Sequence, residues 1–172
     1  MQTILGSWSK SGPLGLNAAS KLAREVAEHE LAHSFTAFNL NYKDTGLFGI
    51  YLKCPDNKLD DAMWYTLDNL VRLCHNVSDE EVARAKTQLK TNMFVSSPTA
   101  IANDIGRQML AYGRVMSPAE IATRIDAITT ADVKGTANKF INDEDHALAA
   151  IGPIFELPDY NWIRRRSYWH RY

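Results

Sequence analysis

Cysteine is scarce in this sequence, since the 172 residues contain only Cys54 and Cys74. Two thiols do not make a disulfide framework, and no C-x-x-C pair suggests a zinc site. No apolar run reaches the roughly 18 residues that a membrane-spanning helix needs. Positive charge is not in excess, and a net charge of −1 argues against a general nucleic-acid binder. The first eight residues resemble neither a secretory signal nor a transit peptide.

What remains is the composition of an ordinary soluble globular protein, with 45% hydrophobic and 23% charged residues. The length fits one domain, or one unit of a larger repeat. Residues 1–8 look like the end of a helix whose beginning is absent. Residues 9–15 are rich in Gly, Pro and Ser and predict a loop.

The stretch from His33 to Lys53 predicts a β-hairpin, around which the other elements are organised. It is rich in aromatic and branched aliphatic residues, which suit a pleated surface. Residues 43–46 (Lys-Asp-Thr-Gly) separate the two runs and have turn chemistry. Amphipathic helices need a surface to cover, and this hairpin offers one.

Most of the remaining chain predicts helix. Apolar residues recur at spacings of three and four over residues 16–28, 58–76, 79–93, 98–113, 118–128 and 130–141. Ser78 with Glu81, and Ser117 with Glu120, fit capping boxes, and Thr130 is expected to cap the helix that follows it. The helix over residues 79–93 is expected to carry Val82, Ala85, Leu89 and Met93 inward. The next helix has Ile101, Ile105, Met109 and Tyr112 on one face. Residues 146–152 predict a buried strand that ends at Pro153.

This order of elements predicts an α/β (α+β layered) fold, in which several helices cover one face of a small, mostly antiparallel sheet. Three strands are few for so many helices, so we expect the sheet to be completed by another chain. We expect an N-terminally incomplete domain over residues 1–157, followed by a basic and aromatic C-terminal arm over residues 158–172.

The strongest catalytic motif is His29-Glu30-Leu31-Ala32-His33, which fits H-E-x-x-H. In zinc peptidases of that type, both histidines lie on one helix and bind Zn²⁺, while the glutamate activates water. Here the helical pattern ends near Glu28, and strand alternation begins at Ser34. We therefore interpret the motif as a coincidence at a helix-to-strand junction. The inverted motif H-x-x-E-H is absent from the sequence.

Other candidate sites are weaker. His75 beside Cys74 could join Cys54 in a metal cluster, but their spacing does not support one. Neither a G-x-S-x-G motif, nor a P-loop, nor a dinucleotide-binding fingerprint is present. The adjacent carboxylates Asp60-Asp61 and Glu80-Glu81 fit a solvated helix surface better than an acid/base pair.

The last residues mix basic and aromatic side chains, and three interpretations stay open. The arm could bind nucleic acid by stacking and charge, or lie at a membrane interface near anionic lipid. It could also pack against a partner subunit, where Trp, Tyr and Arg are favoured, and this interpretation is preferred. The residues concerned are Trp162, Arg164, Arg165, Arg166, Tyr168, Trp169, His170, Arg171 and Tyr172.

Several segments together resemble the pitrilysin-like peptidase family, and within it the branch formed by the mitochondrial processing peptidase β subunit and core protein 1 of respiratory complex III. The similarity follows the C-terminal half of those subunits, in order, over nearly the whole chain. The segments that carry it include Leu31-Ala32-His33-Ser34-Phe35, residues 41–51 (Asn-Tyr-Lys-Asp-Thr-Gly-Leu-Phe-Gly-Ile-Tyr), residues 80–86 and Ala149-Ala150-Ile151-Gly152-Pro153. The similarity is greatest at residues 104–110 (Asp-Ile-Gly-Arg-Gln-Met-Leu) and 124–128.

The resemblance implies that subunits of this family have two similar α/β halves around a cavity, with the inverted zinc motif in the N-terminal half. This chain would be the non-catalytic second half, with no catalytic, cofactor-binding or metal residue of its own. Zinc would come from the partner half. In active single-chain relatives an arginine and a tyrosine hold the substrate backbone, and the corresponding positions here are Ala27 and His33.

The resemblance also implies partners and a location. The partners would be the N-terminal half as a separate chain, the processing peptidase α/core 2 subunit, other complex III subunits and a presequence peptide, with no nucleic acid. The location would be a mitochondrial inner-membrane complex facing the matrix, peripheral to the membrane. The alternatives are an autonomous zinc hydrolase using His29, Glu30 and His33, and a lipid- or nucleic-acid-binding module using the C-terminal arm.

Overall fold

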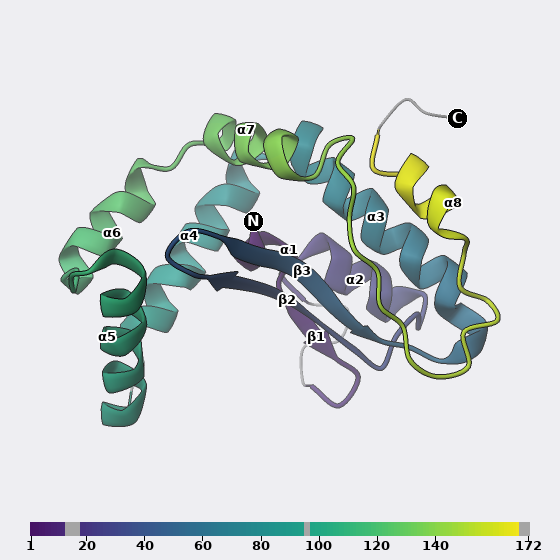
Figure 1. Cartoon of the computed structure of the whole chain (residues 1–172), viewed down its shortest axis with the longest axis horizontal. Helices are drawn as coiled ribbons and strands as arrows, with labels where there is room; N and C mark the ends of the chain where they lie inside the picture. The colour runs from purple at the N-terminus through teal and green to yellow at the C-terminus, as the bar shows by residue number, and fades with distance from the viewer. Residues whose placement is uncertain (13–17, 95–96, 169–172) are drawn as a thin grey trace.

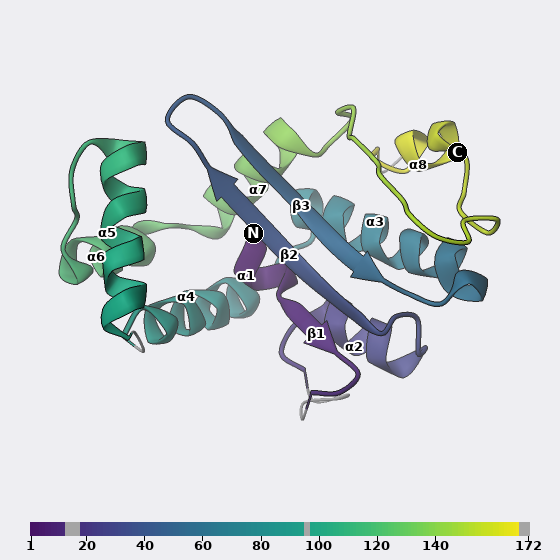
Figure 2. The same cartoon turned by 60° about the horizontal axis from the view of Figure 1, so that its bottom comes forward.

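The computed structural model describes residues 1–12, 18–94 and 97–168. Its centre is a three-stranded antiparallel sheet of order β1-β2-β3, built from β1 (Ser7–Ser9), β2 (Ser34–Asn41) and β3 (Gly46–Lys53). Helices α1 (Gln2–Leu5), α2 (Lys21–Glu28) and α3 (Leu59–His75) lie behind one face of this sheet (Figures 1 and 2). The layered α/β class predicted from the sequence is therefore confirmed.

The remaining helices extend from this centre. They are the short 3-10 helix η2 (Asp56–Lys58), α4 (Asp79–Phe94), α5 (Pro98–Tyr112), α6 (Pro118–Ala127), α7 (Thr130–Phe140) and α8 (Tyr160–Arg165). Helix α7 packs on α3 and α6 contacts α4, whereas α5 lies beyond the end of α4, away from the core (Figures 1 and 2). Within the described residues, no helix combines the length and apolar character needed to cross a membrane.

The hairpin forms as predicted, with Ser34 opposite Lys53 and Asn41 opposite Gly46. Alternate residues of a strand point to opposite faces, and this alternation decides which side chains reach the core. On the helix-covered face Phe35 is 1% exposed and Ala37 is 2% exposed. The core under the sheet combines residues of α1, α2, β2 and α3, among them Leu5, Leu22, Val26, Phe35 and Leu73.

The third strand is not the one predicted. Residues 146–152 form no strand and are mostly exposed, with Ile151 fully so. A strand needs a neighbouring backbone to satisfy its N–H and C=O groups, and no described strand pairs with this segment. Instead β1, which the sequence suggested was partly helix and partly loop, pairs with the first residues of β2. Three residues are too few to produce an alternation pattern.

Two helix starts differ from prediction. The helix expected from residue 16 begins at Lys21, because the Ser20 hydroxyl accepts a hydrogen bond from the Ala23 N–H and caps it. Residues 13–17 lie outside the described part of the chain. The cap expected at Thr130 is Thr129, whose side chain pairs reciprocally with Asp132 in a capping box.

The capping box at Ser78 and Glu81 is confirmed, with both reciprocal hydrogen bonds present. At Ser117 the hydroxyl accepts from the Glu120 N–H as expected. The carboxylate of Glu120 is taken up by ion pairs with Arg114 and Arg124 instead of the reciprocal bond. Charged partners within reach compete successfully for this carboxylate, because charge-assisted hydrogen bonds are the stronger ones.

Candidate functional site

The H-E-x-x-H motif lies at a helix-to-strand junction, as the sequence pattern indicated. Helix α2 ends at Glu28, and His29 follows as its C-cap, with its backbone N–H donating to the Glu25 carbonyl. Glu30 has a positive φ of 49°. His33 precedes β2, and its backbone N–H donates to the Lys53 carbonyl at 2.7 Å. The motif therefore does not occupy one helix, which a helical H-E-x-x-H zinc site requires.

The side chains of this motif have other contacts. The His29 ring stacks on Tyr65, with the ring centroids 5.0 Å apart. The Glu30 carboxylate pairs with Lys10 at 3.5 Å. Among residues 1–12, 18–94 and 97–168, no three His, Cys, Asp or Glu side chains gather as a metal site. These contacts favour a structural role for the junction.

The two cysteines are part of the apolar interior. Cys74 is buried in the core, and Cys54 packs against it from the end of β3. Burial raises the pKa of the Cys54 thiol, and it raises the pKa of the Cys74 thiol to about 11. Because the thiolate is the form that reacts and binds metal, this environment favours inert thiols.

A nearly buried ion pair joins α3 to α4. The Arg72 guanidinium donates to both carboxylate oxygens of Glu81, at 2.8 and 3.0 Å. Burial by itself would raise the pKa of Glu81, but hydrogen bonds from Arg72 and from the Ser78 N–H hold it below its usual value. This pair links α3, the helix under the sheet, to the first turn of α4.

The C-terminal arm packs on the chain itself over its described residues. Ile163 is fully buried, and Arg164 pairs with Asp143 and Asp145. The guanidinium of Arg166 lies over the rings of Trp64 and Trp162. Arg164 and Arg166, two of the three consecutive arginines, therefore help to attach the arm to the rest of the chain. Residues 169–172 lie outside the described part of the chain.

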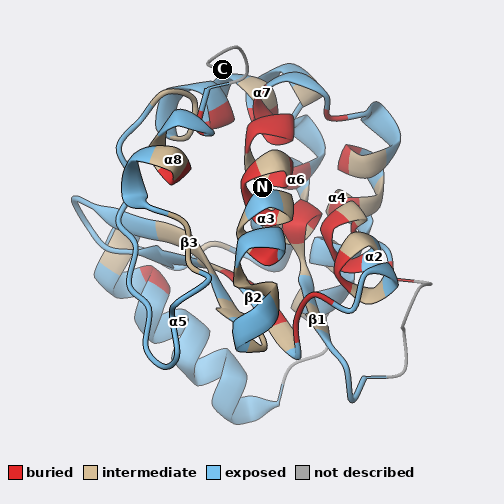
Figure 3. Cartoon of the chain, turned by 90° about the vertical axis from the view of Figure 1, so that its right-hand side faces the viewer, coloured by how far each residue is buried: buried red, intermediate tan, exposed pale blue. Residues whose placement is uncertain are grey.

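Among the described residues, two of the exposed apolar surfaces are the candidate functional sites. One is the outer face of the hairpin, made of Leu40, Tyr42, Leu47 and Tyr51, which are 46 to 66% exposed. The other is the outer surface of α5, where Ile101, Ile105, Met109, Leu110 and Tyr112 are 42 to 81% exposed, and which is exposed along its length in Figure 3. Exposed apolar patches of this kind mark interfaces with other proteins.

Sequence reasoning missed these surfaces because periodicity shows that a helix has an apolar face but not what covers it. The sequence predicted that Leu89 points inward, and this is wrong for the chain alone, since Leu89 is 39% exposed. The apolar face predicted on α5 is uncovered, because each of its residues is at least 42% exposed. The other residues predicted to point inward on α4 are covered, since Val82 and Ala85 are buried and Met93 is half-buried.

A family model described as the peptidase M16 inactive domain matches residues 1–89. A probable mitochondrial-processing peptidase subunit β from Arabidopsis thaliana is 49% identical over the whole chain, and the corresponding subunits of Blastocladiella emersonii and Homo sapiens are 48% and 41% identical over 94% and 98% of it. The chain spans only 33 to 35% of the length of these relatives.

A solved structure titled complex III2 from Candida albicans, with Inz-5 bound, contains a similar chain. The TM-score is 0.90 at 30% identity, and the match covers 97% of this chain and 41% of that one. The resemblance to the C-terminal half of the processing peptidase β/core branch is thus confirmed. The chain therefore belongs to the family of peptidase M16 inactive domains.

Proposed function

We propose that this chain is the non-catalytic C-terminal half of a mitochondrial processing peptidase β/core 1 type subunit. In this role it closes the presequence-processing chamber and provides interfaces in respiratory complex III. The observation that carries the proposal is the match to β subunits along nearly the full chain, together with a family model for an inactive domain. The similar chain in complex III2 supports the second part of the role.

The proposal includes the partners. They are the N-terminal half of the subunit as a separate chain, the processing peptidase α/core 2 subunit, other complex III subunits and a presequence peptide. The outer face of the hairpin and the outer surface of α5 are the contact regions, because both are rich in exposed apolar side chains. The zinc and its general base would belong to the N-terminal half.

We further propose the mitochondrial inner membrane as the location, with the chain peripheral to it and facing the matrix. The names of the relatives support a mitochondrial protein. We also propose a division into a domain over residues 1–157 and an arm over residues 158–172. Arg164 and Arg166 contact other residues of the same chain, which favours an arm that packs against its own domain rather than one that binds lipid or nucleic acid.

The test is affinity purification of the tagged chain from its own mitochondria, with its partners identified by mass spectrometry and zinc counted per chain. The proposal requires complex III subunits and a second polypeptide that carries H-x-x-E-H. Tyr51→Glu on the hairpin face should reduce this recovery. Lys43→Glu, in the exposed turn of the same hairpin, is the matched control and should not reduce it.

The rival function, an autonomous zinc hydrolase, predicts a different result. It requires recovery without partners, one zinc per chain, and loss of that zinc in His33→Ala. The proposed function requires the same zinc content in His33→Ala as in the unmodified chain. Purification without partners but with stoichiometric zinc would overturn the proposal.

A further inference from the structure

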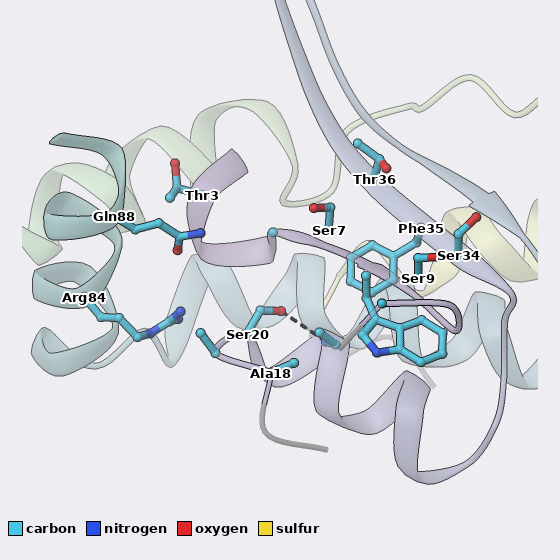
Figure 4. Close-up of a pocket in the computed structure, with 15 residues that line it drawn as sticks. Thr3, Ser7, Ser9, Ala18, Ser20, Ser34, Phe35, Thr36, Arg84 and Gln88 are labelled. Carbon is cyan, nitrogen blue, oxygen red and sulfur yellow. Dashed lines mark hydrogen bonds between the residues drawn. The ribbon is translucent and has the colours of Figure 1, made fainter. Parts of the chain in front are cut away.

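A cavity lined in part by polar side chains, and separate from the H-E-x-x-H motif, lies where α1, α2, β1 and α4 meet. It has a volume of about 370 Å³ and opens between the end of α1, the start of α2 and the side of α4. Its walls are formed largely by small residues, including Gly6, Ala18, Ala19 and Ala23. Figure 4 shows Arg84 and Gln88 reaching from α4 toward this space, with Ser20 and Ala18 on the opposite side.

The cavity contains donors that lack acceptors. Both terminal nitrogens of Arg84 are buried and have no hydrogen-bond partner, and the same holds for the indole nitrogen of Trp8. Glu81, three residues before Arg84 on α4, feels the charge of Arg84, but its carboxylate is bound by Arg72. Buried polar groups are normally satisfied, and an unpaired buried charge is costly.

These groups define the chemistry of the missing partner. A guanidinium presents two parallel N–H donors, which match the two oxygens of a carboxylate or phosphate. Arg84 is the one charged side chain among the described residues that line the cavity. A single positive charge balances a monoanion, which favours a carboxylate over a phosphate dianion. The rest of the lining, with Trp8, Phe35 and three alanines, suits an apolar group attached to that carboxylate.

We propose that this cavity binds a carboxylate on an apolar stem, with Arg84 as the charged anchor. The carboxylate has two possible sources, which share this chemistry. One is a small free carboxylate, and the other is an Asp or Glu side chain of a neighbouring polypeptide. The inference rests on the cavity alone and does not depend on the proposed function.

The first experimental arm tests the free ligand. Sodium butyrate is titrated into the full chain, together with the subunits that purify with it, and binding is followed by saturation-transfer NMR of the butyrate protons. Sodium chloride keeps the ionic strength constant. We expect saturable binding that weakens at least about tenfold in Arg84→Gln, because a charge-assisted pair is lost. Arg107→Gln, on the exposed surface of α5, removes the same charge and should bind as the unmodified chain does.

The second arm tests a protein carboxylate. In Arg84→Lys the positive charge is kept and an amine is introduced, so a carbodiimide can couple it to a carboxylate that lies in the cavity. If the carboxylate belongs to a polypeptide, one defined cross-link forms from position 84 to an Asp or Glu, located by peptide mass spectrometry and absent from the unmodified chain. Because Arg84→Lys keeps the positive charge, it still tests the proposal if Arg84→Gln fails to fold.

Binding of butyrate that depends on Arg84 supports a free ligand, and a defined cross-link supports a polypeptide carboxylate. Failure of both arms would overturn the proposal. Inorganic phosphate that binds at Arg84 more tightly than butyrate would overturn the assignment to a monocarboxylate.

Discussion

The ion pair between Arg72 and Glu81 allows a quantitative prediction about how α4 is held against α3. Glu81→Gln keeps the side-chain shape but removes the negative charge. The side chains of Arg72 and Glu81 are only 11% and 19% exposed, and the two hydrogen bonds are 2.8 and 3.0 Å long. Breaking a buried pair typically costs about 3–5 kcal/mol. Since the glutamine oxygen still accepts one hydrogen bond and the pair is not fully buried, we expect Glu81→Gln to lower the stability of this junction by about 2 kcal/mol.

Hydrogen exchange measured by mass spectrometry can detect this loss, because it reports local opening within an assembled protein. A loss of about 2 kcal/mol corresponds to roughly 30-fold faster exchange of amides at the junction of α3 and α4. The matched control is Glu80→Gln, the neighbouring and exposed carboxylate in the same first turn. It loses only a helix-dipole interaction, and we expect about 0.5 kcal/mol, or roughly twofold faster exchange.

The pH dependence gives an independent check. The folded state lowers the pKa of Glu81, so the unfolded state takes up the proton at higher pH. The contribution of the pair is therefore complete above the unfolded pKa of about 4.5 and is lost as the pH falls through the lower folded pKa. The difference in amide exchange rate between the unmodified chain and Glu81→Gln should therefore shrink below that pH. The reasoning is refuted if Glu81→Gln accelerates exchange no more than Glu80→Gln does at neutral pH.

Three further predictions concern the core, a helix and the thiols. Phe35→Ala should lower the free energy of unfolding by about 3–5 kcal/mol and markedly lower the thermal midpoint, because Phe35 is 1% exposed. Its control, Leu40→Ala on the open face, should change the free energy of unfolding by less than about 0.5 kcal/mol. Gly135→Ala should stabilise α7 by about 0.5–1 kcal/mol, since an added Cβ meets nothing within 4 Å, and an unchanged or lowered midpoint would contradict this. A thiol reagent at pH 7.4 should modify Cys54 before Cys74, whose pKa is raised to about 11, and equal rates would contradict the described burial.

The H-E-x-x-H motif illustrates how a local pattern is interpreted from its neighbours. Five residues match a zinc site, but the end of the helical pattern at Glu28 and the alternation after Ser34 indicated a junction. The structure agrees, because Glu30 has a positive φ that ends helical geometry between the two histidines. The signal was available in the sequence since caps and periodicity act over a few residues.

The Arg84 cavity could not be anticipated in the same way. On α4, Arg84 reads as an ordinary exposed charge opposite the apolar stripe. Its burial comes from α1 and the start of α2, which lie about 60 to 80 positions earlier in the chain and meet α4 only through the tertiary fold. No local pattern specifies that meeting.

The sequence by itself determined the local features: the hairpin, the Ser78–Glu81 box and the end of α5 at Gly113, whose φ is 71°. These depend on contacts between residues close together in the chain, and on side-chain types that suit one backbone geometry. Only the tertiary structure decided that residues 146–152 are not a strand, that β1 is one, and that the apolar face of α5 stays uncovered. Strand pairing and helix burial require a partner from elsewhere, and the identity of that partner is not contained in the periodicity of either segment.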